Sequence, residues 1–182
     1  MNKKLKIKNN ASSLLPSEWV KNNLSISNSD LNLLDLACGN GRHSIYAASI
    51  GYKVTSIDIN KNVLLEIQNK EFIIPIQLDL EKNNIWPLKN NKFDVVIVTN
   101  YLYRPIFKNI IKSMKPNGKL IYETFTEENS AFGKPNNKNY LLRPQELLKF
   151  SRKNKLEIIN YEEIIIKKPI KKAVQRIFSI LK

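Results

Sequence analysis

The sequence predicts an α/β fold in which helices cover both faces of a mostly parallel sheet. Apolar segments alternate along the chain with segments of helical periodicity, and these apolar segments are hydrophobic on both faces, as in buried parallel strands. The last two apolar segments are separated by about a dozen residues, which include Pro169 and show no helical pattern. A hairpin should therefore join them and make one strand antiparallel to the rest.

Seven segments have the composition of strands. Residues 93–99 (FDVVIVT) are apolar enough to lie in the centre of the sheet. The strands are predicted at residues 31–36, 53–57, 72–78, 93–99, 119–125, 156–161 and 173–181.

Helices are expected between these strands. Pro16 and Glu18 suit the start of a short helix, because proline needs no N–H partner there and an acid favours the positive end of the helix. Gly51 should cap the helix that follows the first strand, and residues 116–118 (PNG) should stop a later one. The longer helices are predicted at residues 42–50, 61–70, 104–115 and 144–153, and residues 126–143 have loop composition.

The 182 residues suit one domain with a full core. We expect a loose basic arm over residues 1–12 and a single domain over residues 13–182. No run of about 18 apolar residues occurs, so we expect no membrane partner. A lone cysteine, Cys38, excludes an internal disulfide and a cysteine-rich zinc site. The basic start is not followed by a signal-peptide pattern, so we expect a cytoplasmic protein.

The net charge of +14 raises the question of nucleic-acid binding. Only five of the 30 basic residues are arginine, which is the better bidentate ligand for phosphate. The rest are lysine, and lysine shares A/T-rich codons with the abundant Asn and Ile. Genome composition therefore accounts for the charge, and nucleic acid stays an open but unfavoured partner.

Residues 33–44 (LLDLACGNGRHS) predict a buried strand that turns sharply through glycines into a helix. Gly39 and Gly41 let the backbone bend tightly and let a ligand approach closely. The N–H groups at the start of the helix point into the same crevice. Asp35 lies within the strand, and Asp58 follows Gly39 by 19 residues. Polar groups at other strand ends should share this edge of the sheet: Asp58, Asp79 and Asn100.

These groups favour a cationic nucleoside ligand over a dinucleotide. A nicotinamide cofactor would require a third glycine where Ser44 stands, and Asp35 would repel a pyrophosphate. Asp58 can accept hydrogen bonds from both hydroxyls of a ribose. S-adenosylmethionine fits this set, because it joins an adenosine to an ammonium and a sulfonium group and has no phosphate.

Five motifs lie between residues 30 and 125: residues 35–42 (DLACGNGR), 56–58 (SID), Asp79, residues 93–96 (FDVV) and 115–120 (KPNGKL). Together they resemble the motifs of the class I S-adenosylmethionine-dependent methyltransferases. The resemblance implies a three-layer Rossmann-like fold with a seven-stranded, mostly parallel sheet and one antiparallel strand near the edge. Further motifs, among them residues 100–105 (NYLYRP) and 141–148 (LLRPQELL), are similar to a bacterial subgroup near the tellurite-resistance methyltransferases.

The resemblance also implies which residues bind the cofactor. Gly39 and Gly41 would approach its amino-acid part, and Asp35 would lie near its ammonium group, directly or through water. Asp58 would hold the ribose, and Asp79 would meet the adenine amino group. The expected cofactor-binding residues are Asp35, Ala37, Gly39, Gly41, Asp58, Ile59, Asp79, Leu80 and Asn100, with Ile59 or Leu80 beside the adenine ring.

Methyl transfer from a sulfonium is an in-line displacement, so alignment and water exclusion matter most and a general base is not always needed. Substrate-side candidates follow the fourth and fifth strands: Asn100, Tyr101, Tyr103, Arg104 and Glu123. Residues 126–143 are long enough to form a lid, with Phe132, Tyr140 and Arg143 able to close over a substrate. For His43 we expect packing or hydrogen bonding, for Trp19 core packing, and we expect no metal ion.

A small-molecule acceptor is the favoured interpretation, because the chain is short and shows no appended recognition domain. An RNA or protein methyltransferase that uses the lysine-rich surface stays open. A non-catalytic S-adenosylmethionine-binding protein also stays open, although the intact set of Gly39, Gly41 and Asp58 argues against it. Ser44 and Asp35 disfavour a nucleotide-linked oxidoreductase. The sequence identifies neither the acceptor nor the oligomeric state.

Overall fold

The computed structural model describes residues 15–27, 30–82, 86–90 and 92–182, so the predicted arm over residues 1–12 lies outside the described residues. Seven strands of the described chain form one sheet in the order β3-β2-β1-β4-β5-β7-β6. They are β1 (Asn32–Leu36), β2 (Lys53–Asp58), β3 (Ile73–Gln77), β4 (Phe93–Thr99), β5 (Met114–Phe125), β6 (Leu156–Ile166) and β7 (Lys172–Leu181).

Strand directions confirm the predicted fold class. Pairing is parallel from β3 through β2, β1 and β4 to β5. Only β7 among the described strands runs the other way, antiparallel to both β5 and β6, and it lies one strand in from the edge.

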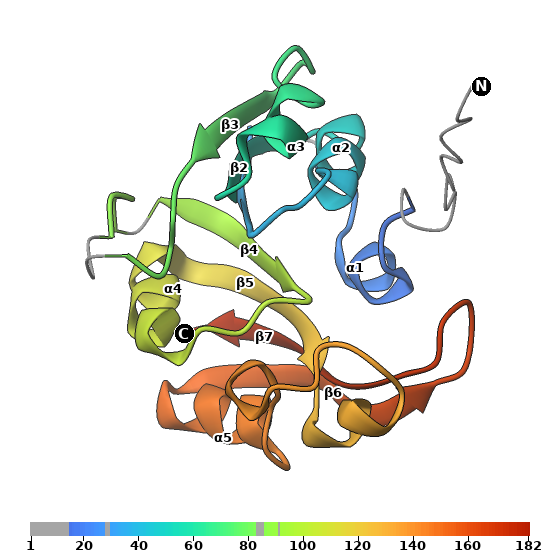
Figure 1. The fold of residues 1–182 in the computed structure, drawn as a ribbon. Helices are drawn as coiled ribbons and strands as arrows, with labels where there is room; N and C mark the ends of the chain where they lie inside the picture. The colour runs from blue at the N-terminus through green and yellow to red at the C-terminus, as the bar shows by residue number, and fades with distance from the viewer. Residues whose placement is uncertain (1–14, 28–29, 83–85, 91) are drawn as a thin grey trace, which may run out of the picture.

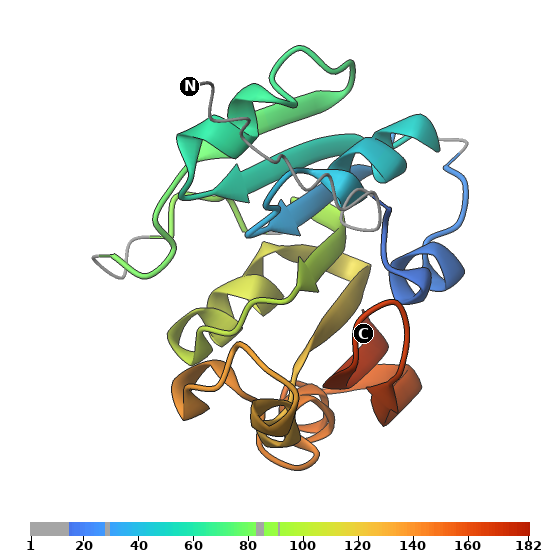
Figure 2. The same cartoon turned by 45° about the vertical axis from the view of Figure 1, so that its right-hand side comes forward.

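Helices cover both faces of the sheet and give three layers (Figures 1 and 2). On one face, α1 (Glu18–Asn23), α2 (Arg42–Ser49) and α3 (Lys61–Leu65) pack in one hydrophobic cluster. On the other face, α4 (Phe107–Ser113) and α5 (Glu146–Lys153) pack in a second cluster.

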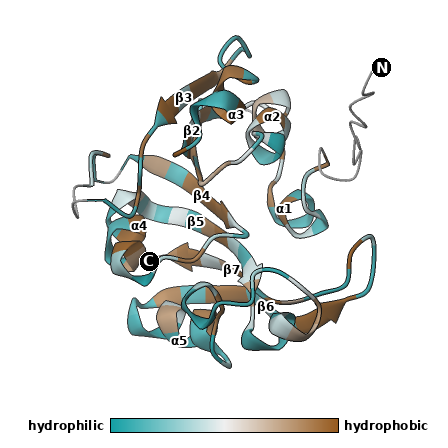
Figure 3. Cartoon of the chain, viewed as in Figure 1, coloured by the Kyte–Doolittle hydropathy of each residue, from teal (hydrophilic) through white to brown (hydrophobic). Residues whose placement is uncertain are grey.

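The central strand β4 joins these two clusters. Val96 and Val98 belong to the cluster under α4 and α5, whereas Val95 and Ile97 belong to the cluster under α1, α2 and α3. Since alternate residues of a strand face opposite sides, both faces of β4 must be apolar. Figure 3 shows this as mostly hydrophobic colour along β4, against hydrophilic residues on the outer surface of α5.

The structure corrects the ends of two predicted helices. The helix predicted at residues 61–70 ends at Leu65, because the following turns bring Ile67 into the core, where it is fully buried. The helix predicted at residues 104–115 begins as a 3₁₀ turn (η2, Arg104–Ile106), continues as α4 and gives way to β5 at Met114.

Two strands and the loop between them also differ from the prediction. The pairing between β4 and β5 changes register near the start of β5. Phe93 of β4 pairs with Met114, and Val95 of β4 pairs next with Lys119, so residues 115–118 of β5 form a bulge. β6 extends to Ile166 because β7 pairs with its whole length, so the hairpin link is short. The loop 126–143 contains two 3₁₀ turns, η3 (Glu127–Ala131) and η4 (Lys138–Tyr140).

The sheet order sets the place of the site. β1 is flanked by β2 on one side and by β4 on the other, so the topology switches direction between β1 and β4. Ligands of open α/β sheets bind beyond the carboxyl ends of the strands at such a point. In the part of the chain that is described, no helix is long and apolar enough to cross a membrane.

Candidate functional site

The turn after β1 is built from backbone in the left-handed region. Ala37, Gly39 and Gly41 have φ angles of 53°, 55° and 73°, which glycine adopts at little steric cost. A Cβ on Gly41 would lie 2.7 Å from Cγ2 of Ile67, so this position has no room for a side chain. A Cβ on Gly39 would meet no described atom within 4 Å, so the space beside its backbone is open to a ligand.

Asp58 ties this glycine turn to the end of β2. Its Oδ2 accepts a hydrogen bond from the Gly39 N–H at 2.8 Å, and its Oδ1 accepts one from the Asn60 N–H at 2.9 Å. Asp58 is partly exposed, and each carboxylate oxygen has capacity for a further donor. The predicted ribose acceptor is therefore fixed by backbone groups and can still accept hydrogen bonds.

Asp35 lies beneath the turn and has no exposed surface. Its Oδ2 accepts a hydrogen bond from the Ser44 hydroxyl at 2.6 Å, and that hydroxyl accepts one from Ser56 at 2.7 Å. Its Oδ1 has no hydrogen-bond partner among the described residues. Burial raises the pKa of Asp35 to about 7, and the Ser44 hydrogen bond and the Arg42 charge oppose this shift. A buried acceptor without a donor favours a ligand that supplies one.

The ends of β2 and β3 carry the residues predicted beside the adenine. Asp79 accepts a hydrogen bond from the Glu81 N–H at 3.0 Å, and the Lys82 ammonium lies 3.9 Å from its Oδ2. Leu80 packs against the cluster under α4 and α5. Ile59 is 59% exposed, so its side chain is free to cover an aromatic ring at this edge.

The chain after β4 carries the predicted acceptor-side residues. Asn100 is exposed, has a φ of 54°, and donates its N–H to the Glu123 carbonyl at 2.9 Å. The Tyr101 hydroxyl is buried, and burial together with the nearby Glu81 carboxylate raises the pKa of this phenol. The Tyr103 hydroxyl donates to the Glu81 carbonyl at 3.3 Å. These residues reach the same edge as the glycine turn.

The Arg104 guanidinium is occupied by contacts within the protein. Its Nε and Nη2 donate to the Glu146 carboxylate at 2.6 and 2.8 Å. Its Nη2 and Nη1 also donate to the carbonyls of Leu141 and Asn139, at 2.9 and 3.0 Å. Arg104 therefore joins the segment before α5 to the first turn of that helix.

The predicted lid, residues 126–143, is held at both ends. Thr126 forms a parallel bridge with Leu142, and the Leu142 N–H donates to the Phe125 carbonyl at 2.8 Å. The residues between Thr126 and Leu142 take no part in these two contacts. The three predicted lid residues occupy exposed or partly exposed positions: Phe132, Tyr140 and Arg143.

Glu123 at the end of β5 has a network that the sequence analysis missed. Glu123 is 1% exposed, and its Oε1 lies 2.8 Å from the Lys172 ammonium. Its Oε2 lies 3.7 Å from Nη1 of Arg176 and accepts a hydrogen bond from the Ser17 hydroxyl at 3.1 Å. The acid at a strand end was the only local signal, because Ser17 is 106 residues away in the sequence.

Helix α1 is fixed to the same edge. The His43 Nε2 accepts a hydrogen bond from the Ser17 N–H at 3.1 Å, which puts the ring proton on Nδ1, 3.2 Å from the Thr99 hydroxyl. Burial lowers the pKa of His43 to about 3, and the positive charges of Arg42 and Lys172 add to this effect. His43 is neutral, and its predicted hydrogen-bonding role is confirmed.

Trp19 packs in the core beside this network, as predicted. It is 4% exposed, and its Nε1 donates to the Ile177 carbonyl at 3.4 Å. The Arg176 guanidinium lies 4.8 Å from the ring centroid.

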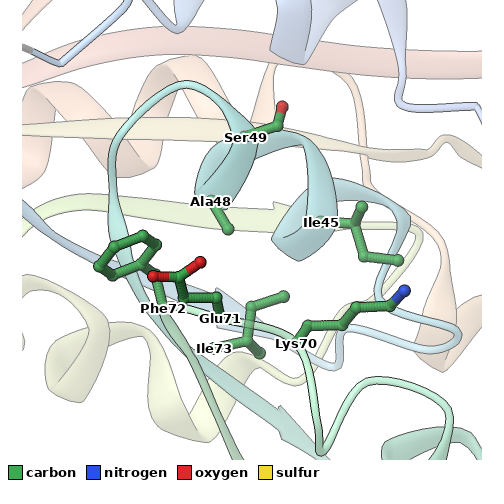
Figure 4. A pocket seen from close by; sticks show the side chains of 7 residues that line it. All are labelled: Ile45, Ala48, Ser49, Lys70, Glu71, Phe72 and Ile73. Carbon is green, nitrogen blue, oxygen red and sulfur yellow. The ribbon is translucent and has the colours of Figure 1, made fainter.

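A separate hollow of about 240 Å³ lies between α2 and residues 70–73, which lead into β3 (Figure 4). It reaches the amino end of β3, opposite the strand ends described above, and so takes no part in that site. Its lining is Ile45, Ala48, Ser49, Lys70, Glu71, Phe72 and Ile73.

The strand-end site fits S-adenosylmethionine. It combines the unpaired buried oxygen of Asp35, the open space beside Gly39 and the partly exposed carboxylate of Asp58. The buried Asp35 carboxylate would attract an ammonium group beside the turn, directly after a small rearrangement or through water, whereas a pyrophosphate would be repelled. Within the described ranges, no three His, Cys, Asp or Glu side chains are grouped so that they could hold a metal ion.

Comparison with known proteins bears directly on this site. A family model described as a methyltransferase domain matches residues 27–178, which include the glycine turn, the strand ends and the predicted lid. The chain belongs to this methyltransferase family. The match confirms the family resemblance drawn from the motifs of residues 30–125.

Individual relatives of this methyltransferase chain are longer. TehB of Haemophilus influenzae, named as a probable S-adenosyl-L-methionine-dependent methyltransferase, is 40% identical over 93 residues, which are 48% of this chain and 32% of TehB. The crystal structure of TehB from this organism matches with a TM-score of 0.67 at 25% identity, over 85% of this chain and 59% of that chain. A ubiquinone biosynthesis O-methyltransferase of Rickettsia akari is 26% identical over 110 residues, or 57% of this chain and 44% of that protein. The matched stretches thus cover less than half of each of these two curated relatives, and the structural match covers 59% of the TehB chain.

Proposed function

We propose that this chain transfers a methyl group from S-adenosylmethionine to a small-molecule acceptor. The observation that carries the proposal is the set of acceptors around the glycine turn: the unpaired oxygen of buried Asp35 and the carboxylate of Asp58, with open space beside Gly39. Membership of the methyltransferase family supports it. When bound, S-adenosylmethionine supplies an electrophilic methyl group on its sulfonium.

The residues of the chain would share the work of binding. Asp35 would attract the ammonium group of the cofactor, and Asp58 would accept hydrogen bonds from the ribose hydroxyls. Asp79 would accept from the adenine amino group, with Ile59 and Leu80 beside the ring. Backbone groups would surround the amino-acid part of the cofactor. They belong to three residues of the turn and to the residue after β4: Ala37, Gly39, Gly41 and Asn100.

The acceptor would bind on the side of β4 and β5. Asn100, Tyr101 and Tyr103 would orient it, because in-line displacement depends on alignment of the nucleophile. Arg104 would hold the lid segment, whose Phe132, Tyr140 and Arg143 would exclude water. The name of one relative, a ubiquinone biosynthesis O-methyltransferase, supports a small molecule in preference to RNA or protein.

The first test is calorimetric titration with S-adenosylmethionine. Asp58→Ala should weaken binding by about 2 kcal/mol, or roughly thirtyfold in Kd, because the ribose loses a charged acceptor. The matched control is Asp94→Asn. Asp94 lies on β4 but near its amino end, where it pairs with Lys115 at 2.8 Å. Wild-type affinity in Asp58→Ala would contradict the cofactor assignment.

The second readout of the same variants identifies the acceptor. The protein is incubated with cell extract and S-adenosylmethionine labelled in the methyl group. Label should enter the small-molecule fraction with the wild type and with Asp94→Asn, and should fall strongly with Asp58→Ala. Label that enters RNA or protein instead would keep the reaction and overturn the small-molecule acceptor.

A further inference from the structure

The hairpin between β6 and β7 ends in a segment, residues 164–172, that we call the hairpin tip. Ile164 pairs with Val174 and Ile166 pairs with Lys172, so the two strands remain paired up to the turn. The turn itself reaches beyond the layered core (Figure 1). The hairpin tip is therefore an ordered feature of the sheet that is presented to the surroundings.

The hairpin tip exposes aliphatic side chains. Ile170 at the turn is 65% exposed, and Ile165 and Ile164 on β6 are 44% and 37% exposed. Ile164 and Ile165 are consecutive in a strand, so they point to opposite faces of the hairpin. Exposed isoleucines on both faces and at the turn leave apolar surface that the described part of this chain does not cover.

The same segment is strongly basic. It contains four lysines, and no acidic residue occurs from residue 164 to the last residue, 182. Lys172 pairs with Glu123, and the Lys171 ammonium lies 4.2 Å from the ring centroid of Phe132. Lys167 and Lys168 are exposed and form no ion pair with a described residue, so they carry the outward charge.

We propose that the hairpin tip docks on the surface of an anionic lipid bilayer. This differs from the expectation of no membrane partner, which rested on the lack of a membrane-spanning segment and not on the membrane surface. Ile170 and Ile165 would enter the headgroup region, and Lys167 and Lys168 would lie against lipid phosphates. Segments that combine exposed aliphatic groups with lysines bind anionic membranes at the interface without spanning them. The anionic bilayer is opposite in charge to the lysines of the hairpin tip, and it would also cover the exposed isoleucines.

RNA matches the hairpin tip less well than lipid. Proteins that bind single-stranded RNA stack bases on aromatic rings or on arginine, and arginine is the better bidentate ligand for phosphate. Residues 164–172 contain neither an aromatic residue nor an arginine. Four isoleucines in that segment would gain nothing from a phosphate backbone, but they gain burial in a bilayer.

Docking at this position would bring the lipid surface close to the predicted lid. The Ala173 N–H, next to the hairpin tip, donates to Oδ1 of Asn129 in η3 at 3.2 Å. Lys171 contacts the Phe132 ring of the lid segment. The proposal depends on these contacts and on the exposed groups, and it does not depend on methyl transfer.

Vesicle co-sedimentation of the full chain tests the proposal. The wild type should bind phosphatidylcholine vesicles that contain phosphatidylglycerol and should not bind phosphatidylcholine alone. Raised salt should weaken the binding, since it screens the lysine charges. The double variant K167E/K168E should reduce the partition coefficient on the order of tenfold or more, and Ile170→Ser should reduce it by a smaller factor.

Matched controls separate the hairpin tip from the general charge of the protein. The variant K108E/K112E makes the same charge change on exposed lysines of α4, and Ile26→Ser removes an isoleucine that is 74% exposed. Both should bind vesicles as the wild type does, and circular dichroism should show all variants folded. Three results would each overturn the proposal: no binding to anionic vesicles at low salt, equal loss in the controls, or binding of the hairpin tip to tRNA but not to vesicles.

Discussion

The two halves of the candidate site are held together in different ways. Around β1 and β2, the functional groups meet through contacts between nearby residues: Gly39 and Asp58 are 19 residues apart, and Asp35 and Ser44 are nine apart. Around β5 and β7, the contacts join distant parts of the chain. The hydrogen bond from Ser17 to Glu123 joins residues 106 positions apart in the sequence, and the one from Trp19 to Ile177 joins residues 158 positions apart.

The halves also differ in how their charges are satisfied. Asp35 keeps one oxygen without a partner, whereas Glu123 is surrounded by Lys172, Arg176 and Ser17. A buried acceptor without a donor is destabilising until a ligand supplies one, whereas a paired carboxylate holds its neighbours in place. The first half is therefore prepared for a ligand, and the second half fixes α1 and the hairpin beside it.

The dependence of stability on pH would test the first half most strongly. Folded Asp35 has a pKa of about 7, against an ordinary value of 3.8. Between these pH values Asp35 keeps its proton in the folded protein and loses it in the unfolded chain, so the contribution of Asp35 to the free energy of unfolding should fall as pH rises, by up to about 4 kcal/mol. Asp35→Asn should remove this fall, as measured by urea unfolding at a series of pH values.

His43 provides the internal control, because its contribution has the opposite sign. Its pKa is lowered from 6.5 to about 3, so the unfolded chain binds the proton first and stability is lost as pH falls below 6.5. His43→Gln should reduce this acid loss and leave the fall that Asp35 causes. A fall in stability with rising pH that appears in His43→Gln and persists in the double variant H43Q/D35N would assign the fall to another group.

Removal of the buried charge in the second half should have the next largest effect. Glu123→Gln should lower the free energy of unfolding by about 3 kcal/mol, because it leaves Lys172 without its buried counter-ion. Arg176 keeps its closer partner, Glu162. Both cations are only partly exposed, with side-chain exposures of 23% and 18%. Denaturant titration at constant pH measures the change.

The control for Glu123 is an exposed ion pair of Glu157 on β6, the edge strand, which β7 separates from β5. Glu157 lies 3.3 Å from the Lys182 ammonium, and the two side chains are 44% and 66% exposed. Glu157→Gln should change stability by no more than about 0.5 kcal/mol. If both variants lost the same free energy of unfolding, the buried ion pair of Glu123 would stabilise the protein no more than an exposed one.

The two glycines of the turn separate folding from binding within the first half. Gly41→Ala should cost about 2 kcal/mol of stability, because it adds strain at a φ of 73° and a contact with Ile67. Gly39→Ala should cost about 1 kcal/mol, because only the strain applies there. Thermal unfolding measures both.

Binding should rank the two glycines by a different criterion. The Cβ of Gly39→Ala would project into the open space beside the turn, so the Kd for S-adenosylmethionine should rise although stability changes little. If Gly39→Ala bound the cofactor as tightly as the wild type, the ligand would not approach at this position.

The sequence predicted the fold well and the ends of its elements less well. The order of strands and helices follows from apolar periodicity, which is local. The end of the third helix depends on Ile67, which the structure buries against Gly41. The full length of β6 depends on pairing with β7, and the sequence of residues 162–166 alone does not indicate that β7 pairs with them.

The sequence by itself determined the glycine turn and the strand-end residues beside it, because tight backbone bends and strand ends depend on local residue types. Gly39, Gly41 and Asp58 lie together at one edge of the sheet, as predicted, and a hydrogen bond joins Gly39 to Asp58. Tertiary structure alone decided that Asp35 is fully buried with one oxygen unpaired, and that Glu123 meets Lys172 and Ser17. Burial and charge pairing arise from packing between distant segments, so no local pattern contains them.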